Sequence, residues 1–250
     1  MIYAVISQKG GVGKTSLVQN AGAEMAAAGM STLLVDYDPQ SNLTTGWGLD
    51  PDADRPTIYD AMLDPGKVTS CVVNLRANLD IIPSNLNLAG AELQFAGDFD
   101  RNGKLKAALA GVAGRYQFIL IDTPPSLGFY VGNALVAAQR VIIPLQAQFY
   151  ALKALQPVFD IVKRAQSVNP GLHVYAIVPT MYDARNSLSE PVVQAARDQY
   201  TKLVTKTQIP VNVRVADSPI HGLPVREHDP NSSGATAYAE LTKELFYGQK

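Results

Sequence analysis

Residues 7–16 read SQKGGVGKTS and end in the Gly-Lys-Thr of a phosphate-binding loop. Glycines let backbone N–H groups approach phosphate oxygens closely and adopt positive φ. In such a loop the ammonium of Lys14 neutralises β- and γ-phosphate charge, and the hydroxyl of Thr15 ligates Mg²⁺. The sequence therefore predicts a nucleotide-binding cradle made of Gly10, Gly11, Val12, Gly13, Lys14, Thr15 and Ser16.

The loop departs from the usual pattern G-x-x-x-x-G-K-[ST] at its first glycine, because position 8 holds Gln8. The neighbouring Lys9 adds a second cation next to the glycines. These residues alone leave three interpretations open: a damaged nucleotide site, a chance glycine cluster, or a variant loop in which Lys9 has a task.

Acidic residues end two apolar runs further along the chain. Asp36 and Asp38 close the run in LLVDYDPQSN, and Asp122 closes the run in FILIDTPPS. An aspartate at a strand end near a phosphate-binding loop can hold the Mg²⁺ shell through water, because the strand fixes its position. We therefore expect Asp122 to serve the metal together with Thr15.

The elements that position these residues alternate along the chain. Short apolar runs predict buried strands, and several lack the alternation of a half-exposed sheet. They cover 2–7, 32–38, 79–84, 118–123, 140–146 and 173–180. Helices are predicted between them near 14–29, 86–97, 103–114, 128–138, 149–168 and 189–206. This alternation indicates an α/β fold, a single-domain doubly wound and mostly parallel sheet over residues 1–250. Residues 46–56 and 209–234 are expected to be loops, the first of them mobile.

Composition limits the function classes. A net charge of −1 gives no electrostatic sign of nucleic-acid binding by the molecule as a whole. The single Cys71 excludes an internal disulfide and any Cys-x-x-Cys site. No apolar run approaches the ~20 residues that span a bilayer, and the amino terminus has no signal-peptide pattern. We expect a cytoplasmic protein.

Taken together, KGGVGKTS, VDYDPQSN and IDTPPSLG resemble the ParA/Soj group of deviant-Walker ATPases, a family that also contains MinD and the nitrogenase iron protein. The likeness continues through 143–152, 180–189, 209–225 and 232–245, which is nearly the whole chain. It implies a P-loop ATPase with ATP and Mg²⁺ as its ligands, slow and stimulated by a partner.

The resemblance also implies roles for individual residues. Lys14 matches the P-loop lysine, and Lys9 matches the signature lysine that reaches the phosphates of a partner subunit. Such a cation stabilises charge on the transferring phosphoryl group, as an arginine finger does, and makes ATP a dimerisation ligand. Asp38 matches the aspartate that positions the attacking water, Thr15 and Asp122 match the Mg²⁺ elements, and Pro210 is placed with the nucleotide-binding residues.

The same resemblance implies an ATP-dependent homodimer that binds DNA without sequence preference through Arg185 and Arg214. A ParB-type activator would stimulate hydrolysis, and the pair would segregate a plasmid or chromosome over the nucleoid. Because the chain begins with the first strand, we expect no N-terminal DNA-binding extension and no recognition of a specific operator.

Three residues depart from the family pattern, namely Val211 for an arginine, Asp217 for a glutamate and Ser41 for a glycine. Val211 removes a cation near the expected nucleotide or dimer surface, where the family contacts the base. Two rival functions are a membrane-linked positioning ATPase of the MinD type and an electron-transfer or metal-carrier ATPase. The weakly cationic last helix disfavours the first, and the lone Cys71 disfavours the second, since a bridging cluster needs two cysteines per subunit. A different cargo, such as a microcompartment, would use the same chemistry.

Overall fold

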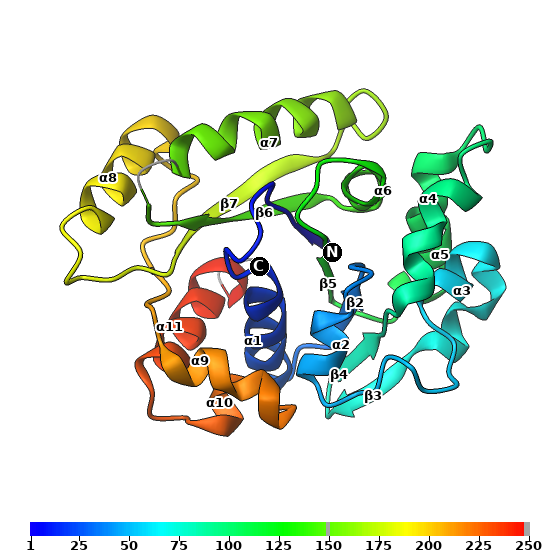
Figure 1. Cartoon of the computed structure of the whole chain (residues 1–250), viewed down its shortest axis with the longest axis horizontal. Coiled ribbons are helices and arrows are strands. Elements are labelled where there is room, and N and C mark those ends of the chain that lie inside the picture. Colours follow the sequence, from blue (N-terminus) through cyan, green and yellow to red (C-terminus); the bar gives the residue numbers. More distant parts are fainter. Residues whose placement is uncertain (149–150, 248–250) are drawn as a thin grey trace.

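The computed structural model describes residues 1–148 and 151–247, which fold around one seven-stranded sheet. The strand order is β3-β4-β2-β5-β1-β6-β7, and every pairing is parallel except that of β3 with β4 (Figure 1). The strands are β1 Ile2–Val5, β2 Thr32–Asp36, β3 Val73–Arg76, β4 Leu79–Ile82, β5 Phe118–Asp122, β6 Arg140–Gln146 and β7 His173–Thr180. The predicted α/β class with a mostly parallel sheet is confirmed.

Helices connect the strands, as crossovers between parallel strands require. They are α1 Lys14–Ala27, α2 Asn42–Gly46, α3 Ile58–Leu63, α4 Ala91–Gln94, α5 Lys104–Ala113, α6 Phe129–Ala137, α7 Ala151–Ala165, α8 Ser189–Tyr200, α9 Val213–Asp217, α10 Val225–His228 and α11 Ser233–Thr242. Short 3₁₀ turns cover Pro65–Cys71, Leu86–Gly90, Arg101–Gly103 and Ser218–His221, and a π turn covers Lys243–Tyr247. The predicted start of α7 at 149 lies outside the described residues.

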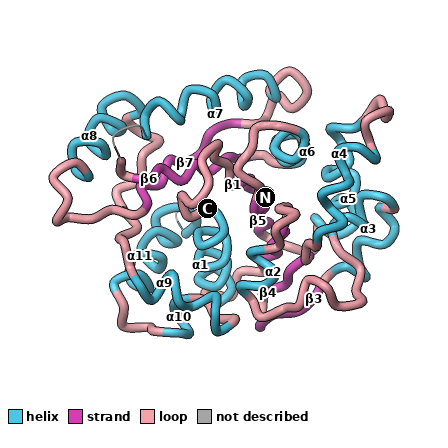
Figure 2. The backbone as a smooth tube through the Cα atoms, in the orientation of Figure 1, coloured by secondary structure: helices cyan, strands magenta, loops and turns pink. Residues whose placement is uncertain are grey.

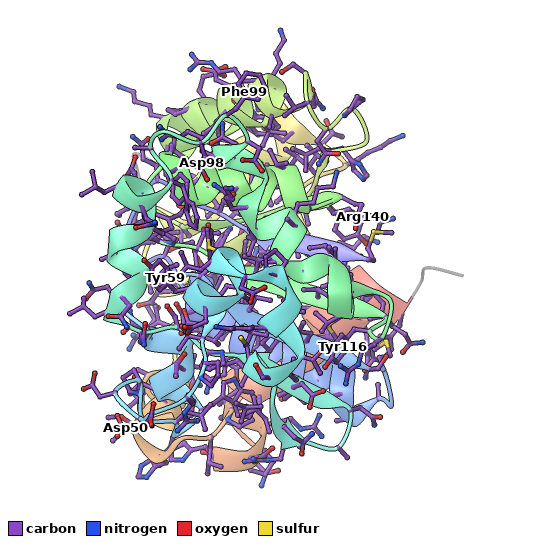
Figure 3. The ribbon with its side chains drawn as sticks, turned by 90° about the vertical axis from the view of Figure 1, so that its right-hand side faces the viewer. Asp50, Tyr59, Asp98, Phe99, Tyr116 and Arg140 are labelled. Atoms are coloured by element: carbon purple, nitrogen blue, oxygen red, sulfur yellow. The ribbon has the colours of Figure 1, made fainter. Side chains whose placement is uncertain are left out.

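Both faces of the sheet are covered, so each strand contributes side chains to two separate cores. Ala4 and Leu33 point into a core completed by α3, α5, α6 and α7, whereas Tyr3 and Leu34 point into a core completed by α1, α10 and α11. Figure 3 looks onto the side of the molecule that carries α3, α4 and α5. Burial on both faces explains why the strand sequences are continuously apolar rather than alternating.

Several elements differ from the sequence-based expectation. The stretch 209–234, expected to be a loop, contains the short helices α9 and α10. The predicted helix 86–97 is a 3₁₀ turn followed by the short α4, and α8 ends at Tyr200, because Thr201 has a φ of 25° that breaks a right-handed helix. The edge strand β3 was not predicted. It spans only four half-buried or exposed residues, which give no apolar run to recognise.

The region expected to be a mobile loop starts inside α2 and carries a buried Trp47, which is 5% exposed. The neighbouring Gly48 and Gly222 meet backbone to backbone. Both have positive φ, and a Cβ on Gly222 would stand 2.9 Å from the Cα of Gly48. The backbone of this loop therefore packs directly against the residue that ends the 3₁₀ turn at 218–221, with no side chain between them.

The last helix packs on the core, as its apolar spacing predicts. Tyr238, Leu241 and Leu245 are all buried in the α1-side core. Among the described residues, no helix combines the length and the apolar character needed to cross a bilayer.

Candidate nucleotide-binding site

Three neighbouring strands bring the predicted site residues to one edge of the sheet. β5 lies between β1 and β2, and the register pairs Asp122 with Val5 on one side and with Asp36 on the other. The loop that follows β1 turns into α1 directly beyond this edge (Figure 2). Ligands of open α/β sheets bind beyond the carboxyl ends of the strands, and the predicted cradle stands there.

The phosphate-binding loop has the backbone conformation that its glycines predict. Gly11 and Gly13 have φ values of 70° and 88°, which L side chains rarely adopt. Gly13 is the N-cap of α1, so the N–H groups of the first helical turn open toward the loop, and no acidic side chain stands in that turn. Ser16 lies in the same turn. The positive end of α1 therefore faces the space that phosphate would take.

Neighbouring segments fix this loop. The carbonyl of Val12 accepts a hydrogen bond from Oγ1 of Thr180 at 2.8 Å, which ties the loop to the end of β7. A Cβ built on Gly10 would lie 3.8 Å from Pro125, so the loop after β5 runs along its other side. The cradle is thus held between the ends of β5 and β7 in a preformed shape.

Lys14 is 7% exposed and stands close to two carboxylates. Burial lowers its pKa, while the charges of Asp122 and Asp38 raise it. Within the described residues its ammonium makes no hydrogen bond, so its donors are available to a phosphate group. Lys14 is therefore a cation held in a partly dehydrated site next to the helix N-terminus.

Thr15 and Asp122 meet as the sequence predicts. The Thr15 hydroxyl donates to Oδ2 of Asp122 at 2.6 Å, and Oδ1 of Asp122 is buried without a hydrogen-bond partner. An orphaned carboxylate oxygen in the interior costs free energy unless a cation or donor satisfies it. A hydroxyl and a carboxylate are ligands that Mg²⁺ accepts, so the residues present fit this metal.

The surroundings of Asp122 also favour a cation. Burial raises the pKa of its carboxyl to about 8, and the negative charge of Asp36 on the adjacent strand adds to the rise. Two carboxyls side by side in the interior repel each other when both are ionised. A divalent cation removes that repulsion, which is a second reason for the fit.

Asp38 follows β2 in a tight turn. Its Oδ1 accepts a hydrogen bond from the N–H of Gln40 at 2.9 Å, and its carbonyl accepts one from Ser41 at 2.9 Å. Ser41 has a φ of 55°, a left-handed conformation that glycine adopts without strain. The substitution of serine for the expected glycine is therefore accommodated in an unfavourable backbone conformation, and the turn that carries Asp38 is kept.

A buried network behind Asp38 was not predicted from sequence. Oδ2 of Asp36 accepts hydrogen bonds from both N–H and Oγ1 of Thr44 at 2.7 Å, while Oδ1 accepts from the N–H of Asp38 at 3.2 Å. The Thr44 hydroxyl in turn accepts from the N–H of Ser84 at 3.0 Å. Asp36 thus joins the turn of Asp38 to α2 and to the end of β4.

Lys9 is exposed, and its ammonium forms hydrogen bonds within its own subunit. Its Nζ donates to Oε1 of Gln146 at 2.6 Å and to Oε1 of Gln148 at 3.0 Å. Gln146 is the last residue of β6, which lies next to β1 in the sheet, and Gln148 stands two residues further on. Sequence reasoning assigned no role to either glutamine, because both stand in a stretch matched only by resemblance.

The predicted DNA-contacting residues lie on two adjacent segments. Arg185 is in the loop between β7 and α8, and Arg214 is in α9, which Figure 1 shows on the side opposite α3 and α5. A bridge between Tyr182 and Pro210 joins these segments. Pro210 therefore runs beside the chain that leaves the end of β7.

Both arginines have carboxylate partners in this structure. Arg185 binds Asp183 through Nε and Nη2, each at 3.0 Å, and its side chain remains 88% exposed. Arg214 Nε lies 3.3 Å from Asp229, with its side chain 56% exposed. Such exposed pairs contribute little to stability, so either guanidinium can exchange its carboxylate for a phosphate.

Comparisons with known proteins agree on the class of this site. A family model described as an AAA domain matches residues 1–174. The chain is 42% identical to the chromosome-partitioning ATPase Soj of Treponema pallidum, over 96% of this chain and 94% of that protein. It is 39% identical to the chromosome partitioning protein ParA of Caulobacter vibrioides, over 98% and 93%.

A solved structure gives the same answer for the fold. It is described as cobyrinic acid a,c-diamide synthase of Mycobacterium smegmatis with bound ATP analogue and magnesium. It superposes with a TM-score of 0.87 at 33% identity, covering 100% of this chain and 96% of the other.

Proposed function

The chain belongs to the ParA/Soj family of ATPases, within the ParA/MinD superfamily, and from this membership we propose that it is a nucleotide-switched partition protein. In the proposed cycle ATP drives two subunits together, the dimer binds DNA without sequence preference, and hydrolysis releases it. ATP hydrolysis and a role in partition follow from the family; the dimer, the DNA contacts and the activator are proposals.

The observation that carries the proposal is the junction of Lys14, Thr15 and Asp122 at the mouth of the P-loop. ATP is the nucleotide and Mg²⁺ the cofactor of this class, and the residues present fit both. The N–H groups after Gly13 would surround the phosphates, Lys14 would neutralise them, and Thr15 with Asp122 would hold the metal. Bound Mg²⁺ supplies charge neutralisation at the β- and γ-phosphates.

The hydrolytic step needs a group that orients water. Asp38 is 6% exposed, and its turn is fixed from behind by Asp36, so it presents a carboxylate beside the phosphate site with little freedom. We propose that this carboxylate orients the attacking water. Preorganised groups act without reorganising during the reaction, which is why a rigid turn suits this task.

Lys9 is proposed to act across the dimer. Lys9→Ala is expected to lower kcat at least about 100-fold and to prevent dimer formation with ATP, because each site loses a cation delivered in trans. Binding of nucleotide to the monomer should change less than about twofold, since Lys14 remains. Sedimentation with a non-hydrolysable ATP analogue and single-turnover hydrolysis measure these effects.

The matched control for Lys9→Ala is Lys106→Ala, which removes an exposed lysine from α5. A dimer of wild-type affinity in the Lys9 variant contradicts the assignment.

Non-specific DNA binding is proposed to use Arg185 and Arg214, which a dimer would present twice. Their exposure and their proximity through the bridge between Tyr182 and Pro210 support this proposal. Arg214→Glu should weaken DNA binding by the ATP-bound dimer about tenfold or more at moderate salt, because a phosphate contact becomes a repulsion. It should also flatten the dependence of log affinity on log salt.

The test is a titration of DNA with ADP, ATP and a non-hydrolysable analogue at several salt concentrations. Lys106→Glu makes the same change of sign on α5, far from α9, and should leave DNA binding unaltered (Figure 1). Dimerisation should survive in both variants. An equal loss of DNA affinity in both variants would indicate a general charge effect. Unchanged DNA affinity in the Arg214 variant would exclude Arg214 from the DNA interface.

The remaining members of the proposed system are a ParB-type activator, a plasmid or chromosome as cargo, and the nucleoid as the place of action in the cytoplasm. The family membership supports these proposals, and the genes next to the coding sequence would identify the cargo. Stimulation of hydrolysis by a ParB-type protein in the presence of DNA is the direct test of the activator.

The two rival functions find little support among the described residues. The apolar side chains of α11 that a membrane would need, Tyr238 and Leu241, are buried in the core. Cys71 is fully buried, and burial raises the pKa of its thiol to about 11, which disfavours the thiolate that metal ligation requires. ATP-dependent binding to liposomes would revive the MinD-type alternative.

A further inference from the structure

Lys9 lines a pocket of about 400 Å³ that lies between the P-loop and the first turns of α7. The pocket has apolar walls, formed by Val12, Ile143, Leu145, Ala154 and Leu155. Its polar lining includes Lys9, Gln146 at the end of β6, and Gln148. Among the residues that the structure describes, the ammonium donates to the amide oxygens of Gln146 and Gln148.

The geometry of Gln146 is set by a further contact. Its Nε2 is directed to Sδ of Met181 at 3.3 Å, so its oxygen faces Lys9. Gln146 is the last residue of β6 and pairs with Thr180 of β7, the residue whose hydroxyl holds the P-loop at Val12. Gln146 thus stands at the end of a strand that is paired on both sides, rather than in a loop.

From this geometry we infer that Gln146 and Gln148 are positioning residues that hold Lys9 on its own subunit until a dimer forms. The inference rests on the proposed function, in which Lys9 acts on the phosphates of the second copy. To reach them, Lys9 must leave both amide oxygens. The monomer is competent to dimerise only in the fraction of time that Lys9 is released, and the apparent dissociation constant rises by the inverse of that fraction.

The chemistry of the acceptors suits a reversible hold. An amide oxygen is neutral, so its hydrogen bond to an exposed ammonium is weaker than an ion pair with a carboxylate of the same reach. Phosphate oxygens carry negative charge and can therefore displace both amides. A carboxylate at position 146 would compete with the phosphates for Lys9, and the hold would become harder to release.

The test uses three variants of the full chain. Leucine fills the volume of glutamine without an acceptor, so Gln146→Leu combined with Gln148→Leu removes the hold. Gln146→Glu strengthens it. Gln156→Leu is the matched control, because Gln156 is an exposed glutamine on α7 that contacts Asp160 and not Lys9. Thermal unfolding checks that all variants are folded.

The first readout is the engagement of Lys9 by the two glutamines, measured in nucleotide-free protein as the reactivity of the Lys9 amine. Lys9 is acetylated with limiting acetic anhydride and quantified by mass spectrometry against Lys106. An ammonium engaged by two acceptors reacts slowly, so acetylation of Lys9 should increase about fivefold in the double leucine variant and fall in Gln146→Glu. The Gln156 control should match the wild type. Unchanged Lys9 reactivity in the double variant overturns the inference.

The second readout is dimerisation with a non-hydrolysable ATP analogue, measured by sedimentation. The dissociation constant should fall about fivefold in the double leucine variant and rise about fivefold in Gln146→Glu. Increased Lys9 reactivity with an unchanged dissociation constant overturns the positioning role. Failure of the wild-type chain to dimerise contradicts the proposed function, whereas the acetylation readout tests the hold on Lys9 in the monomer by itself.

Discussion

Replacing Lys14 with alanine is expected to weaken Mg-ATP binding by about two to three orders of magnitude. Lys14 is the first residue of α1, and its buried side chain stands beside Asp122 and Asp38. Loss of one partner from a desolvated charge pair costs about 3–5 kcal/mol, and about 1.4 kcal/mol corresponds to a tenfold change in affinity. The variant also leaves two carboxylates near the phosphates without this cation.

Isothermal titration with Mg-ATP and Mg-ADP measures the effect directly. Both nucleotides should be affected, because Lys14 is proposed to contact the β-phosphate as well as the γ-phosphate. Lys106→Ala removes a lysine from α5 and serves as the control. Wild-type affinity in the Lys14 variant would show that the phosphates bind elsewhere, and the P-loop interpretation would have to be given up.

Replacing Asp38 with alanine should stop turnover while nucleotide binding persists. Positioned acid–base and water-orienting groups contribute about 10²–10⁴-fold to rate, so kcat should fall at least about 100-fold. Since the phosphate cradle is untouched, the variant should accumulate as an ATP-bound dimer. Single-turnover hydrolysis and sedimentation with ATP itself measure the two effects.

Asp38→Asn separates the charge of this residue from its role in the turn. Asparagine retains an oxygen that can accept the hydrogen bond from the N–H of Gln40, which alanine lacks. If Asp38 orients water, both variants should lose turnover. If alanine alone is impaired, the carboxylate serves the backbone turn and not the chemistry. Turnover at the wild-type rate in both would exclude Asp38 from hydrolysis.

Much of this architecture is predictable because it rests on local patterns. Strands buried on both faces read as continuous apolar runs, and the glycines of the P-loop mark the positive φ values found at Gly11 and Gly13. The meeting of Thr15 and Asp122 follows from two strand ends in one parallel sheet. The replacement of the family's glycine by Ser41 was recognised in the sequence, but the left-handed backbone conformation of Ser41 was not predicted.

What sequence reasoning missed depends on contacts between distant segments. The hydrogen bonds of Lys9 join residues 137 and 139 positions apart, and no local pattern indicates that an amide at the end of β6 will face the P-loop. Thr44 likewise gains its place behind Asp38 only through the packing of α2 against α1 and β2. The edge strand β3 escaped because its side chains are half-buried at most.

The contact between Gly48 and Gly222 restricts how this protein can change over generations. A side chain at position 222 would strike the backbone at position 48, and the positive φ at both positions penalises any L residue in addition. Gln19 reinforces the junction by donating to the carbonyls of Gly46 and Leu223. The loop with Gly48 lies downstream of the Asp38 turn, and the loop with Gly222 lies downstream of α9, the helix that carries Arg214. Substitutions in either loop are therefore limited by the shape of the other loop. The segment that follows Asp38 and the segment that follows Arg214 must consequently change together.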